Sequence, residues 1–237
     1  FWSQVWLVAC NTTLKPYLSI EAATSTVELK YGKLRILEEK NIGISRADVV
    51  MVLDGAVCGI EIKSDADTYA RLSRQVKDYD RFFDYNYIVV GSTHAGSVES
   101  HVPEHWGIVT VELIEDKIDF YLLKKPLPNP NLVLMDKLRM MWRPELVEIQ
   151  AHFLMPAYKA SSKEFVIGKI AERTTLEENH KNYIDIKDLN MVISDILFER
   201  DYNLIADKIK EYRQLQHPEK KVRRKRKRYR RKSVKSI

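Results

Sequence analysis

Residues 45–90 read SRADVVMVLDGAVCGIEIKSDADTYARLSRQVKDYDRFFDYNYIVV and combine two kinds of periodicity. Two apolar runs flank Asp54-Gly55, a dipeptide typical of the tight turn in a β-hairpin. Apolar residues then recur at spacings of four, three and four, which is one face of an α-helix: Leu72, Val76, Tyr79 and Phe83. A short apolar run over 85–91 follows. The stretch predicts two strands, a helix that Asp67 or Thr68 caps, and a third strand.

The flanking sequence extends this pattern into a mixed sheet followed by helices. Strand-like alternation covers 34–39, 106–113 and 117–123, the last two joined by a tight turn at Glu115-Asp116. Helical spacing recurs over 132–142, 144–153, 163–173, 186–198 and 202–214. We therefore expect an α/β fold with a mixed β-sheet core and a mostly helical C-terminal region.

Composition shifts divide the chain into segments. PLPNPN at 126–131 contains three prolines, which remove amide donors and fix φ, so it is predicted to be a linker. It separates a core over 25–125 from a helical region over 132–217, while the structure of 1–24 stays open. Residues 218–237 have almost nothing to bury and are expected to be disordered without a partner.

Composition also excludes several classes of protein. No apolar stretch is long enough to cross a bilayer, and the apolar residues 1–10 lack the basic leader of a signal peptide. Two cysteines are too few for a disulfide framework, so a cytoplasmic location is expected. Glycine-rich phosphate loops and serine-nucleophile motifs are absent from the sequence. His94, His101 and His105 are interpreted as solvated loop residues, not metal ligands.

Two acids and a lysine are predicted to meet on the hairpin. Glu61 and Lys63 are two residues apart on one strand, so they project to the same face while Ile60 and Ile62 point into the core. An antiparallel turn at Asp54-Gly55 brings Asp48 beside them. Taken alone, such an E-x-K tripeptide is more often a surface salt bridge.

This group suits metal-dependent hydrolysis of a phosphodiester. Asp48 and Glu61 are hard oxygen ligands for Mg²⁺ or Mn²⁺, and the backbone carbonyl of Ile62 is a candidate third ligand. Lys63 is placed to position the attacking water or to stabilise the charged transition state.

The order Asp48 then Glu61-Ile62-Lys63 resembles the PD-(D/E)xK, or restriction-endonuclease-like, superfamily. A narrower, poorly characterised bacterial family in it carries S-R-A-D, E-I-K-S-D and D-(S/T)-x-x-R-L-x-x-Q, matched here at 45–48, 61–65 and 67–75. Ala47 replaces the proline that names the superfamily. The resemblance covers 35–125 well and extends loosely to 141–146. It implies a restriction-endonuclease-like core and nuclease activity.

The resemblance also implies auxiliary residues. Glu39 fits best as a further catalytic and metal-binding acid, with Glu38 and Glu28 as competitors. Gln75 and Tyr79 share a helix face and match the Q-x-x-x-Y pair that lies beside the metal and touches substrate in RecB-like exonucleases, although Tyr79 equally suits the core. Arg71 is a candidate phosphate contact or an ordinary surface residue.

Charge is concentrated at the C-terminal end. Residues 218–237 hold twelve Lys or Arg and one acid, a net charge of +11, and since the whole chain carries +6, the first 217 residues carry −5. Such a tail favours nucleic-acid binding, with an acidic protein, ribosomal RNA or an anionic membrane surface as alternatives. The candidate contacts are Arg223, Arg224, Lys225, Arg226, Lys227, Arg228, Arg230 and Arg231.

Together these features predict a Mg²⁺- or Mn²⁺-dependent nuclease that acts on DNA. The alternative is a catalytically inactive nucleic-acid-binding or regulatory module that keeps the fold and uses the basic tail. A third hypothesis is a toxin or defence component that needs a protein partner, for which the C-terminal helices offer a docking surface.

Overall fold

The computed structural model describes residues 34–202 apart from 115–116, together with 207, 210 and 211. The chain divides into two compact units, Phe1–Asp201 and Tyr202–Ile237, and nearly all the described residues belong to the first. The predictions for 1–24, for the turn at 115–116, for the tail at 218–237 and for most of the helix at 202–214 lie outside the described residues.

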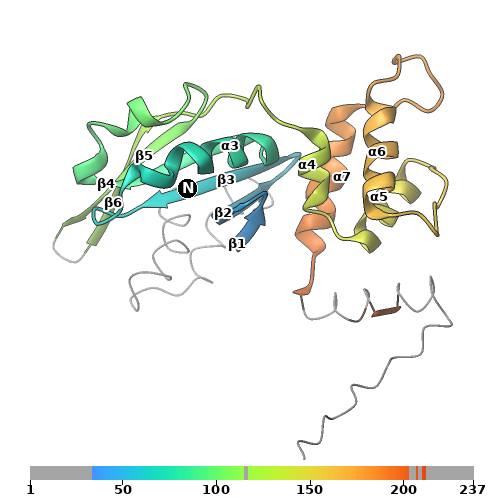
Figure 1. Cartoon of the computed structure of the whole chain (residues 1–237), viewed down its shortest axis with the longest axis horizontal. Helices are drawn as coiled ribbons and strands as arrows, with labels where there is room; N and C mark the ends of the chain where they lie inside the picture. The colour runs from blue at the N-terminus through green and yellow to red at the C-terminus, as the bar shows by residue number, and fades with distance from the viewer. Residues whose placement is uncertain (1–33, 115–116, 203–206, 208–209, 212–237) are drawn as a thin grey trace, which may run out of the picture. The chain divides into compact units, whose positions relative to one another are not determined.

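A mixed six-stranded sheet forms the centre of the first unit, as predicted (Figure 1). The strands follow chain order, with β1–β2, β2–β3 and β5–β6 antiparallel and β3–β4 and β4–β5 parallel. Their bounds are β1 Arg35–Ile42, β2 Ser45–Leu53, β3 Ala56–Lys63, β4 Tyr85–Gly91, β5 Gly107–Ile114 and β6 Lys117–Lys124. The β2–β3 hairpin turns at Asp54-Gly55, where Gly55 adopts the left-handed φ of +69° that this turn requires.

One helix supplies the crossover between the parallel strands β3 and β4. It is α3, Leu72–Phe82, and a short 3₁₀ turn, Tyr69–Arg71, precedes it. The predicted capping by Asp67 or Thr68 is wrong. Asp67 accepts hydrogen bonds from the amide and hydroxyl of Ser64 at 2.8 and 2.7 Å, so it closes a turn before the helix, and the Thr68 side chain makes no capping bond.

The second half of the described chain is helical, as predicted. Ser162 caps α6 by accepting a hydrogen bond from the Phe165 amide, and Asp185 caps α7 by accepting from the Lys187 amide. The helix predicted over 132–142 is shorter than expected and ends before the next one begins at Arg143-Pro144. The four helices are α4 Leu134–Arg139, α5 Arg143–His152, α6 Lys163–Thr174 and α7 Ile186–Glu199.

Apolar side chains are buried on both faces of the sheet. One cluster includes Tyr79 of α3 and Phe83, the residue after it, together with side chains of α4 to α7. The other includes Ile60, which is fully buried, and partly buried Ile62 packs against it. The prediction that these isoleucines face the core is confirmed, but the opposite face is not a solvent surface because α3 packs there.

Polar ties connect the helical region to the sheet. The Lys137 ammonium of α4, which has no exposed surface, donates to the Asp84 carboxylate at 2.6 Å and to Asn190 of α7 at 2.7 Å. Asp84 also accepts from the Val57 amide at the start of β3. In the predicted linker, the side-chain amide of Asn129 donates to the Phe83 carbonyl at 2.7 Å. The division of the chain into domains at 126–131 stays a prediction.

The interpretation of the histidines holds only in part. His105 is buried and its Nε2 lies 2.9 Å from Asp80 Oδ1, which also accepts from Trp106 Nε1 and Asn86 Nδ2. The prediction that His105 is a solvated loop residue is therefore wrong, because Asp80 in α3 supplies a buried partner. Within the described ranges no helix is long and apolar enough to cross a membrane.

Gly59 allows α3 to lie close against β3. A Cβ at this position would overlap the rings of Phe83 and Tyr79, whereas a Cβ at Gly96 would meet no atom within 4 Å. We expect Gly59→Ala to lower the free energy of unfolding by about 1–3 kcal/mol through overpacking. Gly96→Ala is the matched control and should change it by less than about 0.5 kcal/mol. Denaturant unfolding measures both; equal stability of the two variants would contradict the close packing of α3 on β3.

Candidate functional site

The hairpin brings Asp48 beside the residues predicted to act with it. Val49 pairs with Ile60 across β2 and β3, so the next positions outward on the two strands are Asp48 and Glu61. The Ile62 amide donates a hydrogen bond to Asp48 Oδ2 at 2.9 Å. One carboxylate oxygen of Asp48 is thereby held against the backbone of β3.

Glu61 is at the centre of the cluster and is fully buried. Its Oε1 accepts from the Lys63 ammonium and from the Gln75 amide of α3. Lys63, which is 5% exposed, also donates to Gln75 Oε1 at 3.1 Å. The predicted Glu61, Lys63 and Gln75 therefore form one hydrogen-bonded group between β3 and α3.

Tyr79 completes this group from the next turn of α3. Its hydroxyl donates to Glu61 Oε2 at 2.8 Å, with the Ile60 carbonyl 3.2 Å away, and it accepts from the Asp48 amide at 3.2 Å. Its ring packs against Phe83 and Trp106 with centroid distances of 5.4 and 5.5 Å. Tyr79 is thus both a core residue and a hydrogen-bonding member of the site.

Burial sets the electrostatics of the three acidic groups. It raises the pKa of the Asp48 carboxyl, against the Ile62 amide and the Lys63 charge, which lower it. Burial and then the Asp48 charge raise the pKa of Glu61, while Lys63 and Tyr79 oppose them. Burial also raises the pKa of the Tyr79 hydroxyl, and the nearby carboxylates add to this. The two desolvated carboxylates face the Lys63 ammonium, and the Arg46 charge also lowers the pKa of Asp48, yet burial still raises both pKa values, so a further cation would be favourable here.

The described residues supply two acids to this site. No group of three or more His, Cys, Asp or Glu side chains arranged to hold a metal is found in the described ranges. Glu39 lies in β1 between the pairs Glu38↔Val49 and Lys40↔Ala47, so its backbone is across from Asp48. The side chains of Glu38 and Glu39 and the whole of Glu28 are outside the part of the chain that the structure describes, so the auxiliary acid stays a prediction. The Ile62 amide donates to Asp48, as described above. The role of the Ile62 carbonyl as a metal ligand stays a prediction.

Other candidates lie apart from this cluster. Arg71 is exposed at the end of the 3₁₀ turn, so its contact with phosphate stays a prediction. Shortly before Arg71 in the chain, the side chain of Asp65, which follows β3, accepts from the Thr93 hydroxyl at 2.6 Å and so connects the segment after β3 to the 3₁₀ turn after β4. The basic residues between Arg223 and Arg231 lie outside the described residues.

The sequence reasoning missed a cavity between the sheet and the C-terminal helices. Lys40, Lys163 and Arg200 all line it. No local motif marks these three residues, because they come from segments far apart in the chain and only the packing of the helices on the sheet brings them together.

Comparison with solved structures finds SfsA of Pyrococcus furiosus, described as a complex with Ca²⁺. The match has 14% sequence identity and a TM-score of 0.27, and it covers 44% of this chain and 59% of the SfsA chain. No curated protein matches the chain. The family model described as bacteriophage P4 protein cII matches residues 29–217, which is most of the chain, and the chain therefore belongs to this family.

Proposed function

We propose that this chain is a metal-dependent nuclease that hydrolyses phosphodiester bonds in DNA, with Asp48, Glu61 and Lys63 as its central residues. The observation that carries the proposal is their convergence near the start of β2 and the end of β3, together with Gln75 and Tyr79 of α3. Two carboxylates and an ammonium group in one buried cluster are the side chains that hydrolysis of a phosphodiester requires. The resemblance of the Asp48 and Glu61-Ile62-Lys63 motifs to the PD-(D/E)xK superfamily adds support.

The acids present fit a small divalent cation. Mg²⁺ and Mn²⁺ prefer oxygen ligands, and Mg²⁺ commonly takes one or two protein carboxylates and fills its other positions with water and substrate phosphate. Asp48 and Glu61 would hold it, and burial raises the pKa of both carboxyl groups, so a bound cation would favour their charged forms. Such an ion supplies Lewis acidity at the phosphate and acidifies a bound water.

The remaining side chains orient this pair. Lys63 has three N–H donors, of which two point to Glu61 and Gln75, so within the described residues a third is available for a phosphate oxygen or a water. Gln75 fixes Lys63 and Glu61 relative to each other, and Tyr79 fixes the second oxygen of Glu61. Lys63 would act at the phosphate, while Gln75 and Tyr79 position Glu61.

One observation favours the alternative of an inactive nucleic-acid-binding module. Both oxygens of Glu61 already accept hydrogen bonds from Lys63, Gln75 and Tyr79, so the cluster is also a self-contained buried ion pair. In an inactive module these bonds would only stabilise the junction of α3 with the hairpin. Nuclease assays and metal binding separate the two functions.

With Mg²⁺ or Mn²⁺, the purified full-length chain should cut DNA. Asp48→Asn and Lys63→Ala should each lower the rate roughly a hundredfold or more, because each removes a charge that acts on the transition state. Asp54→Asn and Lys77→Ala change exposed residues of the same types and should keep the wild-type rate. Gel assays on single- and double-stranded DNA measure this; undiminished cutting by Asp48→Asn or Lys63→Ala would overturn the assignment, and a wild-type chain that binds but never cuts DNA would favour the inactive module.

Metal binding has a readout that is independent of activity. Mn²⁺ should raise the melting temperature of the wild-type chain and of Asp54→Asn but not of Asp48→Asn, because Asp48 would bind the ion together with Glu61, whereas Asp54 lies at the other end of the hairpin. At a metal concentration a hundred times the Kd, the stabilisation is about 2.7 kcal/mol. Differential scanning calorimetry with and without Mn²⁺ tests this, and equal shifts in the two Asp→Asn variants would place the ion elsewhere.

The basic tail offers a means of recruiting the substrate. Residues 1–217 carry −5 and would be repelled by DNA, whereas 218–237 carry +11. Removing 218–237 should weaken DNA binding and flatten its dependence on salt concentration, because fewer counterions are released from the DNA. Fluorescence anisotropy at several salt concentrations gives the slope, and an unchanged slope would show that the tail serves another partner.

A further inference from the structure

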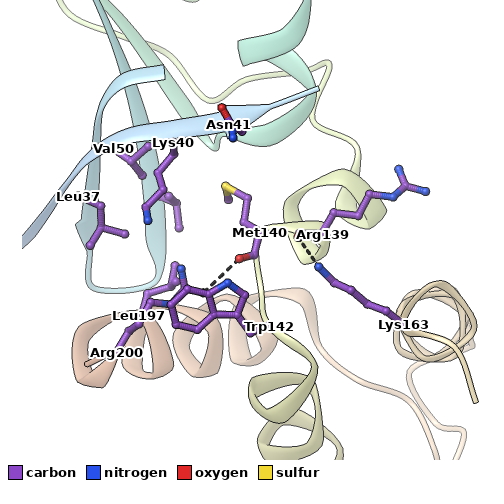
Figure 2. A pocket seen from close by; sticks show the side chains of 11 residues that line it. Leu37, Lys40, Asn41, Val50, Arg139, Met140, Trp142, Lys163, Leu197 and Arg200 are labelled. Atoms are coloured by element: carbon purple, nitrogen blue, oxygen red, sulfur yellow. Dashed lines mark hydrogen bonds between the residues drawn. The ribbon is translucent and has the colours of Figure 1, made fainter. Parts of the chain in front are cut away.

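The cavity missed by the sequence analysis has a volume of about 240 Å³. It lies between β1, β2 and β3 of the sheet and the segments around α4 to α7 (Figure 2). It shares no lining residue with the Asp48–Glu61 cluster. Val57, which lines it, precedes Glu61 by four residues of β3, which is about 13 Å along a strand. Val50, which also lines the cavity, lies two residues from Asp48 on β2, so the cavity adjoins the Asp48–Glu61 cluster but has its own set of lining residues.

Its described lining contains four basic residues and no acidic one. Figure 2 shows that Arg139 directs its guanidinium away from the others, which fits its hydrogen bonds to Glu164. The three remaining cations come from different parts of the fold: Lys40 from β1, Lys163 from the first turn of α6 and Arg200 from the residue after α7. A concentration of positive charge with no acidic lining is suited to an anion.

Arg200 is the fixed member of this group. Its Nε and Nη2 donate to the Glu145 carboxylate at 2.7 and 2.6 Å, and Nη2 also donates to the Met140 carbonyl at 3.1 Å. The guanidinium lies 4.2 Å from the centre of the Trp142 ring. These contacts fix the position of Arg200 in the wall of the cavity. Glu145, which helps to hold Arg200, does not itself line the cavity.

Lys163 carries a partly desolvated charge. Its ammonium is partly buried and donates to the Arg139 carbonyl at 2.7 Å, and within the described residues its two other donors are available for a ligand. Burial lowers its pKa, the Arg200 and Arg139 charges act in the same direction, and Glu164 and Glu145 oppose them. An anion in the cavity would stabilise the charged form of Lys163.

We propose that this cavity binds a phosphoryl group, with Lys40, Lys163 and Arg200 as its cationic contacts. A phosphate ester carries several acceptor oxygens and up to two charges, which suits the two ammonium groups better than a carboxylate does, while Arg200, whose charge Glu145 balances, adds a fixed hydrogen-bond donor. The volume is below the usual range for drug-sized ligands and suits a phosphate with an attached sugar. Leu37, Val50 and Leu197 give the cavity an apolar side for that sugar.

The phosphoryl group has two possible sources, a free nucleotide or the backbone of a nucleic acid. Calorimetric titration of the full-length chain in metal-free buffer, which leaves the Asp48–Glu61 site unengaged, uses inorganic phosphate, a nucleoside monophosphate, a short single-stranded oligonucleotide and acetate as the singly charged control. Inorganic phosphate should bind more tightly than acetate. Tighter Lys163-dependent binding of the oligonucleotide than of the monophosphate would identify the nucleic-acid backbone, and the reverse order would identify a free nucleotide; both support the site.

Three variants test the assignment of Lys163. Lys163→Met should weaken phosphate binding at least tenfold and abolish the rise in melting temperature that phosphate causes, whereas Lys163→Arg keeps the charge and should retain both effects. Lys159→Met removes an exposed lysine four residues earlier and is the matched control. Should Lys163→Met fail to fold, Lys40→Met tests the same cavity from β1. A wild-type chain that phosphate neither binds nor stabilises, or equal losses in Lys163→Met and Lys159→Met, would overturn the proposal.

Discussion

The hydroxyl of Tyr79 joins α3 to both strands of the central hairpin. It donates to the Glu61 carboxylate of β3 and accepts from the Asp48 amide of β2, so one atom fixes the helix and the two acids relative to one another. Gly59 makes this possible because a side chain there would push the Tyr79 ring away from the sheet. The alignment of Gln75 with Lys63 follows, since Gln75 lies one turn earlier on the same helix.

The cost of this arrangement is the burial of charge. Glu61 and Lys63 are almost fully inside the protein, and burial penalises the charged form of both Asp48 and Glu61. A purely structural ion pair gains little from such a position, because apolar residues often stabilise as well or better. A site that binds a cation and a phosphate, by contrast, benefits from acids that water and neighbouring charges do not fully compensate.

Much of the fold and of this site could be predicted because the signals are local. The Asp54-Gly55 turn fixes the register of β2 and β3, and the spacing of Leu72, Val76 and Tyr79 fixes which face of α3 packs on the sheet. The side chain of His105 could not be placed, because its buried partner Asp80 belongs to a helix 25 residues earlier. The predicted helix cap at Asp67 is wrong because the Asp67 carboxylate accepts a hydrogen bond from Ser64 instead of from the first turn of the helix.

The two sites differ in how far apart their residues lie in the chain. The Asp48 amide and the Tyr79 hydroxyl are separated by 31 residues, so the hairpin and the crossover helix bring them together with short loops. Lys40 and Arg200, in contrast, line the same cavity only after the helical region has packed onto the sheet. Because closing a long loop costs more entropy than closing a short one, the acidic cluster should form early in folding and the basic cavity late. During synthesis on the ribosome, the hairpin and α3 emerge before the helices that close the basic cavity, so the two sites are completed in that order.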